Sequence, residues 1–237
     1  MHIGLIGGIG PAATEFYYRK LIDAHKLAGQ PLDLTIVNAE TTALVQNMED
    51  GAPEKQVATY LKLAKRLHAA GAEAMVISSI GGHFCVKEFE PVSPLPLIKI
   101  IPALKAELTN KNLKRIGLLG SRVSMATKLY GGIEGIEIVV PPGNDLDAVH
   151  DAYITMAGVG SVTQQQRELF FNMGKTLCEE QGAEAIVLSG TDLFLAFDGQ
   201  DCGFTTIDSA LAHINAILKA SLGAAAEGVL YETRLNQ

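Results

Sequence analysis

Two short segments of the sequence carry side chains suited to acid and base chemistry. Ser79 and His83 follow one apolar run. Gly190, Thr191 and Asp192 follow another. A hydroxyl beside an imidazole can act as a nucleophile or relay a proton, and a carboxylate can orient the imidazole or move a proton itself. Because no G-x-S-x-G nucleophile elbow is present, hydroxyls that only cap the turns after buried strands are the alternative.

Five further residues are suited to holding an anion such as a carboxylate. Gly8 and Gly10 stand between an apolar run and a predicted helix, whose first backbone N–H groups favour a negative charge. Ser121 and Ser124 open a second such helix, and Asn38 follows a predicted strand. Turn geometry explains the glycines and helix capping explains Ser121 equally well, so both interpretations stay open.

The same glycines make only a weak cofactor motif. Gly8, Gly10 and Ala13 fit the G-x-G-x-x-A dinucleotide fingerprint, but the motif begins one residue late after the strand. Glu40 also lies farther along the chain than the ribose-binding acid of that fingerprint should. The six histidines show no metal-ligand spacing. We therefore expect no cofactor and no metal.

The elements that must position these residues follow from the hydropathy pattern. Apolar, β-rich runs alternate with longer amphipathic stretches, which is typical of an α/β fold with parallel sheets flanked by helices. Helices are expected over residues 54–70 and 208–222. The predicted strands cover residues 3–6, 34–38, 74–78, 97–100, 116–119, 137–140 and 185–188, with a short run near 205–208.

An internal repeat organises these elements. The segment IGLIGG at 3–8 reappears as IGLLGS at 116–121, and GAEAMVIS at 71–78 reappears as GAEAIVLS at 182–189. Two matches at nearly the same offset indicate a duplicated β-α-β unit with pseudo-twofold symmetry. We expect a first lobe of residues 1–101 plus 208–237 and a second lobe of residues 102–207. Their strand C-termini should face a cleft between the lobes, with Ser79 and Gly190 at equivalent positions.

Composition narrows the choice of partner. The 237 residues are 48% hydrophobic, enough for a substantial core, and the net charge of −7 comes without any basic run. We therefore expect neither nucleic acid nor a membrane as partner. The first residues lack signal-peptide features, and the three cysteines are widely spaced, which favours free thiols in the cytoplasm.

Several motifs together resemble the aspartate/glutamate racemase family. They are GLIGGIGPAAT at 4–14, GAEAMVISS at 71–79 with the following His83, LLGSRVSM at 118–125, GAEAIVLSGTD at 182–192, and IDS at 207–209 with the following His213. The resemblance covers nearly the whole chain. It implies a cofactor-independent amino-acid isomerase that binds a small amino acid or dicarboxylic acid, works as a homodimer, and uses two thiols on opposite faces of the substrate Cα.

The sequence departs from that family pattern at both thiol positions. The family motif C-N-T before the histidine corresponds to residues 79–81, where Ser79 stands first, and G-C-T-E corresponds to 189–192, where Gly190 stands in place of cysteine. A thiol pKa near ~8.5 supplies a thiolate at neutral pH, whereas a hydroxyl lies near the ~15.7 of water. Two-thiol racemisation is therefore not expected.

Three functions remain open. The first is a racemase-type isomerase with an altered acid–base set, and the second is a non-catalytic or regulatory small-acid-binding protein. The third is a one-sided decarboxylase or lyase, which needs fewer bases. If the missing thiols are the main difference, Ser79→Cys with Gly190→Cys should restore some proton exchange.

Overall fold

The computed structural model describes residues 1–8 and 10–234, which form two compact units. Unit 1 consists of Met1–Ile100 and His213–Tyr231. Unit 2 consists of Ile101–Ala212 and the described residues from Glu232 onward. The chain therefore passes from unit 1 to unit 2 and back. Along the described residues, no helix is long and apolar enough to cross a membrane.

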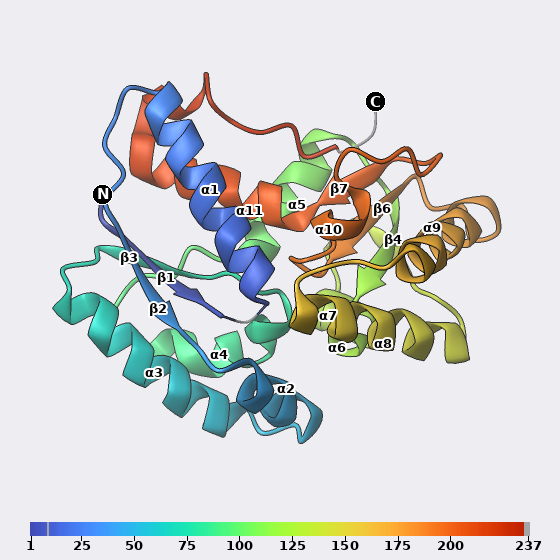
Figure 1. Ribbon diagram of the computed structural model, residues 1–237, viewed down its shortest axis with the longest axis horizontal. Coiled ribbons are helices and arrows are strands. Elements are labelled where there is room, and N and C mark those ends of the chain that lie inside the picture. Colours follow the sequence, from blue (N-terminus) through green and yellow to red (C-terminus); the bar gives the residue numbers. More distant parts are fainter. Residues whose placement is uncertain (9, 235–237) are drawn as a thin grey trace. The chain divides into compact units, whose positions relative to one another are not determined.

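Unit 1 is built on a parallel sheet of three strands in the order β2-β1-β3. The chain continues from β1 to β2 on one side of β1, and then from β2 to β3 on the other side. Because crossovers between parallel strands are right-handed, these two connections place α1 and α3 on opposite faces of the sheet, as Figure 1 shows. The elements that lie wholly in unit 1 are β1 (Ile3–Gly7), α1 (Pro11–Leu27), β2 (Leu34–Asn38), α2 (Thr41–Glu49), α3 (Pro53–Ala69), β3 (Ala74–Ile77), η1 (Gly81–Cys85), α4 (Val86–Phe89), η2 (Glu90–Val92) and η3 (Gly223–Ala226).

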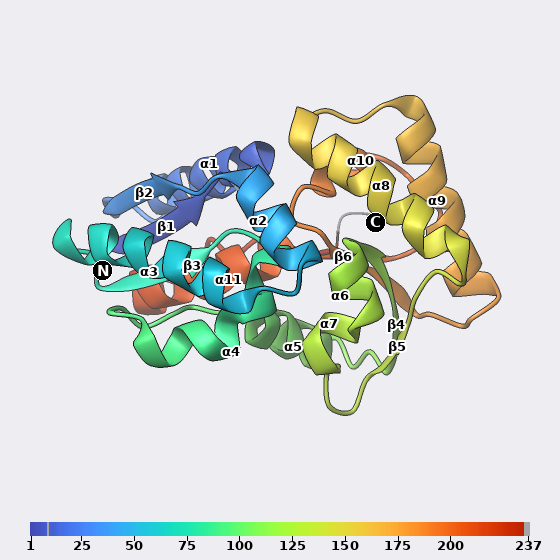
Figure 2. The same cartoon turned by 90° about the horizontal axis from the view of Figure 1, so that it is seen from below.

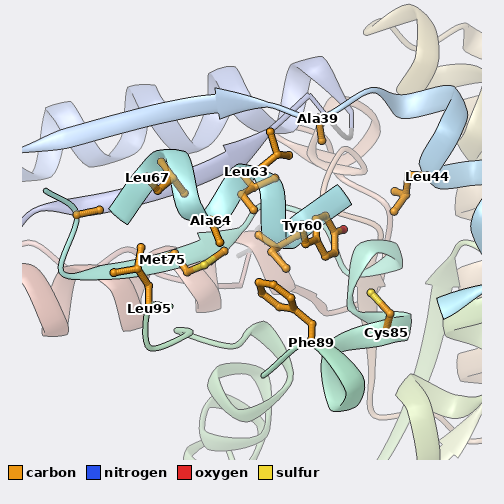
Figure 3. Close-up of a cluster of buried hydrophobic side chains, with 13 residues drawn as sticks. Ala39, Leu44, Tyr60, Leu63, Ala64, Leu67, Met75, Cys85, Phe89 and Leu95 are labelled. Atoms are coloured by element: carbon orange, nitrogen blue, oxygen red, sulfur yellow. The ribbon is translucent and has the colours of Figure 1, made fainter. Parts of the chain in front are cut away.

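Helix α3 supplies much of the unit 1 core, shown in Figure 3. Tyr60, Leu63, Ala64 and Leu67 recur at helical spacing and are almost fully buried against the sheet. Each such leucine contributes about 1.5–3 kcal/mol through burial. A Cβ at Gly4 of β1 would lie 2.9 Å from Leu67 Cδ1, so the glycine lets the helix approach the strand closely.

Unit 2 is built on a parallel sheet of four strands in the order β5-β4-β6-β7. Helices α8 and α9 are neighbours, as Figure 2 shows. The elements are β4 (Arg115–Gly120), α6 (Arg122–Ala126), α7 (Lys128–Gly131), β5 (Glu137–Val139), α8 (Asn144–Val159), α9 (Gln164–Glu179), β6 (Ala185–Ser189), α10 (Phe194–Phe197) and β7 (Thr206–Asp208). Two helices, α5 (Ile100–Asn110) and α11 (Ser209–Leu222), contain the first two points where the chain passes between units, and a third lies between Tyr231 and Glu232.

The two sheets share one three-strand arrangement. In unit 1 the Ser78 hydroxyl donates to the Ile6 carbonyl at 3.2 Å. In unit 2 the Ser189 hydroxyl donates to the Leu119 carbonyl at 2.9 Å. These bonds link equivalent strands at equivalent places, since β1 pairs with β3 as β4 pairs with β6. The predicted α/β fold with parallel sheets flanked by helices is confirmed.

One predicted strand, at residues 97–100, is wrong. Leu97 forms only a single parallel bridge with Met75, and α5 already begins at Ile100. Two hydrogen bonds, from Met75 N to Pro96 O and from Ile98 N to Met75 O, join this segment to β3. A short apolar run does not distinguish a strand from a buried helix start, and Pro102 suits a first helical turn.

Candidate functional site

The candidate residues follow the C-terminal ends of the strands in both units. In unit 1 the direction of the crossovers reverses between β1 and β3, and in unit 2 it reverses between β4 and β6. Open α/β sheets bind ligands at such switch points, outside the carboxyl ends of the strands. Gly8 and Ser79 follow β1 and β3, while Ser121 and Gly190 follow β4 and β6. Each unit therefore brings its own candidates to the edge where a ligand site is expected.

His83 does not contact the hydroxyl of Ser79. Its Nδ1 lies 2.6 Å from the Ser79 carbonyl oxygen, which can only accept, so Nδ1 carries the proton. Its Nε2 accepts a bond from Ile100 N at 3.5 Å, and the Ser79 hydroxyl accepts from Gly82 N at 3.1 Å. Burial, assisted by the charge of Lys99, lowers the His83 pKa to about 4. The hydroxyl–imidazole pair is therefore not formed. The alternative interpretation holds, since the Ser79 hydroxyl caps the turn after β3 and His83 holds the same turn.

His213 packs against His83 of this turn and is hydrogen-bonded to Tyr17, and the sequence pattern predicted neither contact. His213 donates through Nε2 to the Ile98 carbonyl at 2.8 Å, and its Nδ1 accepts from the Tyr17 hydroxyl at 2.9 Å. The His213 and His83 rings meet edge to face at 6.3 Å between centroids. Burial, with the neighbouring His83, lowers the His213 pKa to about 3. The sequence marked His213 only through the family resemblance and gave no indication of Tyr17, because helical spacing shows burial but not bonding partners.

Gly8 and Gly10 have positive φ angles, 87° and 82°, which explains glycine at both positions. The Gly8 N–H donates to the Thr14 hydroxyl at 2.7 Å, and its carbonyl accepts from the Thr41 hydroxyl. A Cβ at Gly8 would lie 2.2 Å from Asn38 Oδ1. Asn38 itself donates to the Ala39 carbonyl at 3.0 Å. The structure thus brings Gly8 and Asn38 together, and their role in anion binding stays a prediction.

Ser121 and Ser124 are buried and bonded within unit 2. Ser121 caps α6 by accepting from Ser124 N at 3.3 Å. The Ser124 hydroxyl donates to the Ser121 carbonyl at 2.8 Å and lies 3.1 Å from the Ser189 hydroxyl. These serines therefore tie the start of α6 to the end of β6. A carboxylate-binding role for them stays a prediction.

Asp192 has a partner from another element of unit 2. Tyr153 of α8 donates its phenol hydrogen to Asp192 Oδ2 at 3.4 Å, and both side chains are buried. Thr191 is also buried and forms a side-chain hydrogen bond with Tyr153. The Tyr153 ring lies where a side chain at Gly190 would project. The sequence predicted the three loop residues but not Tyr153, which is 37 or more positions away from them along the chain.

Two of the cysteines, Cys85 and Cys178, do not carry an activated thiol. Cys85 is fully buried in the unit 1 core beside Phe89, and burial together with the charge of Glu88 raises its pKa to about 12 (Figure 3). Burial also raises the pKa of Cys178 on α9. Cys202 donates to the Phe204 carbonyl at 3.3 Å. Within the described part of the chain, no group of three or more His, Cys, Asp or Glu side chains is placed to hold a metal ion.

Doubly wound α/β units with polar residues at their switch points are typical of proteins that bind small molecules. The sequence model of the Asp/Glu/hydantoin racemases matches residues 6–217, and the chain belongs to this family.

Solved structures with the same fold include three that are similar over nearly their full length. A candidate Asp/Glu racemase from Yersinia pestis is 26% identical, with a TM-score of 0.77 over 98% of this chain and 100% of its own. An aspartate racemase homologue from Pyrococcus horikoshii is 24% identical, with a TM-score of 0.73 over 95% and 99%. The aspartate racemase of Picrophilus torridus is 21% identical, with a TM-score of 0.74 over 93% and 94%.

Proposed function

We propose that this protein is a cofactor-independent isomerase of the racemase type that moves a proton at the carbon next to a carboxylate. Its substrate is a small amino acid or dicarboxylic acid. Membership of the family supports the reaction class. In this proposal, side-chain oxygens take the place of the two thiols. The Asp192 carboxylate is the base, and the Ser79 hydroxyl is the polar group at the equivalent position of unit 1.

The burial of Asp192 beside Thr191 at the end of β6 is the observation that carries this proposal. A carboxylate positioned beside the reacting carbon can act as the general base that removes its proton. The raised pKa values of Cys85 and Cys178 support a reaction without a thiolate.

The cleft between the lobes, the homodimer and the cytoplasmic location stay predictions. Light scattering of the purified protein tests the dimer.

Incubation with L- and D-aspartate and glutamate in deuterated water tests the proposal. We expect deuterium at Cα or a change of enantiomer, and loss of a general base should slow it by about 10²–10⁴-fold in Asp192→Asn. The exposed Asp145→Asn is the matched control and should keep the wild-type rate.

Other outcomes identify the alternatives. A ligand-induced rise in melting temperature without exchange would favour a non-catalytic binding protein. Release of carbon dioxide from a substituted malonate would favour a decarboxylase. Absence of exchange and of any thermal shift across these acids would contradict the proposed function.

A further inference from the structure

The space beside Gly190 is occupied by an aromatic ring. A Cβ at this position would lie 2.3 Å from Tyr153 Cε2, 2.5 Å from Cζ and 2.9 Å from the phenol oxygen. Gly190 is not among the residues with positive φ, so backbone conformation does not require glycine here. The ring in its present position leaves no room for a Cβ, so a side chain at 190 would have to displace it.

The same ring brings a hydroxyl to the two residues that follow Gly190. The Tyr153 hydroxyl donates to Asp192 Oδ2 at 3.4 Å and forms a hydrogen bond with the Thr191 side chain. Burial first, and then the charge of Asp192, raise the Tyr153 pKa well above its ordinary value of 10. Tyr130 of α7 acts in the same direction. The phenol therefore keeps its proton and serves as a donor.

Helix α8 holds Tyr153 in this place through contacts one turn earlier. His150 accepts a hydrogen bond from Arg122 N at 3.0 Å, at the start of α6. The Arg122 guanidinium in turn donates to Asp147 of α8 at 2.7 Å. Since residues three apart share a helix face, the bond to His150 anchors the face of α8 that carries Tyr153.

We propose that Tyr153 is a positioning residue that takes the place of a side chain at residue 190 and holds the Asp192 carboxylate in its reactive orientation. The inference rests on the proposed function, in which Asp192 is the base. Unit 2 then uses the Asp192 carboxylate of the loop after β6 together with the Tyr153 phenol of α8. The family pattern has a single thiol at this place. A side chain at 190 and the Tyr153 ring exclude one another.

The variant Tyr153→Phe tests the inference because it keeps the ring and removes only the donor. A hydrogen bond to the charged form of a carboxyl lowers its pKa, so its loss should raise the Asp192 pKa by roughly 0.5–1 pH unit. Carbon-13 NMR of aspartate-labelled protein measures this pKa directly, with Asp192→Asn to assign the signal. In a plot of the Cα exchange rate against pH, the acid limb should move to higher pH by the same amount. At a pH below the Asp192 pKa, the rate of Tyr153→Phe should then be ~3–10-fold lower than that of the wild type.

Controls separate this inference from the proposed function. Tyr18→Phe, at an exposed tyrosine of α1, should change neither the Asp192 pKa nor the exchange rate. An unchanged Asp192 pKa in Tyr153→Phe would overturn the inference even if Asp192→Asn abolishes exchange. A shifted pKa supports the inference, and absence of exchange in the wild-type protein would then contradict the proposed function alone.

Discussion

Residue 190 shows how a missing side chain can determine its surroundings. Since Gly190 leaves its side-chain direction open, the Tyr153 ring enters that space and reaches Asp192. The expectation that cysteines at 79 and 190 would restore exchange stays a prediction, and it meets an obstacle because a cysteine Cβ at 190 would meet the ring. Restoration would also require a smaller residue at 153.

We expect Gly190→Ala to lower the free energy of unfolding by about 1–3 kcal/mol, as overpacking of a filled site does. Gly158→Ala on the exposed side of α8 is the matched control, since a Cβ there meets no atom within 4 Å. It should instead stabilise the helix by about 0.5–1 kcal/mol. Urea unfolding measures both. Equal stability of Gly190→Ala and the wild type would show that the ring leaves this space free.

Cys85 should behave as a packing residue. Its raised pKa and full burial leave almost no thiolate at neutral pH, so alkylation of the native protein should be much slower than in the unfolded chain. Cys202, which is only partly buried, is the internal comparison and should label faster. Mass spectrometry after timed iodoacetamide labelling separates the two sites. Rapid labelling of Cys85 in the native protein would contradict this assignment.

At the scale of elements, the turn α7 stores backbone strain. Lys128, Leu129 and Tyr130 all have positive φ angles, 49°, 60° and 62°, which cost roughly 1–2 kcal/mol each outside glycine. Burial of Leu129 and a bond from Tyr130 N to the Thr127 hydroxyl at 3.0 Å hold the turn. The turn also places the Tyr130 phenol where it affects the Tyr153 pKa.

Glycine should relieve this strain at the exposed Lys128. We expect Lys128→Gly to raise the free energy of unfolding by up to about 1 kcal/mol. Lys175→Gly, at an exposed position inside α9, should lower it by about 1 kcal/mol because ordinary helical backbone favours lysine. Thermal unfolding of both variants measures the difference. A loss of stability in Lys128→Gly would mean that its side chain outweighs the relieved strain.

Sequence periodicity predicted the elements well and the contacts between them poorly. The strand at 34–38 was predicted with its observed bounds, and the helix at 54–70 is shifted by a single residue. The strand at 97–100 and the left-handed turn at α7 depend on tertiary contacts that no local pattern shows. In the same way, the sequence pattern singled out the loops after β3 and β6 but not Tyr17, which bonds His213, or Tyr153, which bonds Asp192.

At the scale of the whole molecule, two buried neutral histidines couple folding to pH. The unfolded chain takes up a proton on His83 near pH 6.5, but the folded protein does so only near pH 4. The unfolded state therefore binds more protons in this window, and stability falls as the pH falls through it. For His83 alone the loss is on the order of 3 kcal/mol. His213 adds a change of the same sign.

The variant His83→Gln should weaken this pH dependence. Urea unfolding at pH 7.5, 5.5 and 4.5 should show a smaller decrease of the free energy of unfolding than in the wild type, because one of the two histidines no longer titrates. His68→Gln, at an exposed position of α3, is the control and should keep the wild-type slope. If the free energy of unfolding of His83→Gln decreased with pH as steeply as that of the wild type, the interpretation of His83 as a buried neutral histidine would be contradicted.

The path of the chain through the two units has a consequence for synthesis on the ribosome. The unit 1 fold needs residues 213–231, where His213 bonds Tyr17 and the Tyr231 hydroxyl donates to the Lys20 carbonyl at 2.7 Å. Residues 1–100 should therefore leave the exit tunnel as an incomplete fold until residues 213–231 follow. Residues 101–212 emerge before that and contain almost all of unit 2. Domains usually fold in the order of translation, but here we expect residues 101–212 of unit 2 to fold before unit 1 is complete.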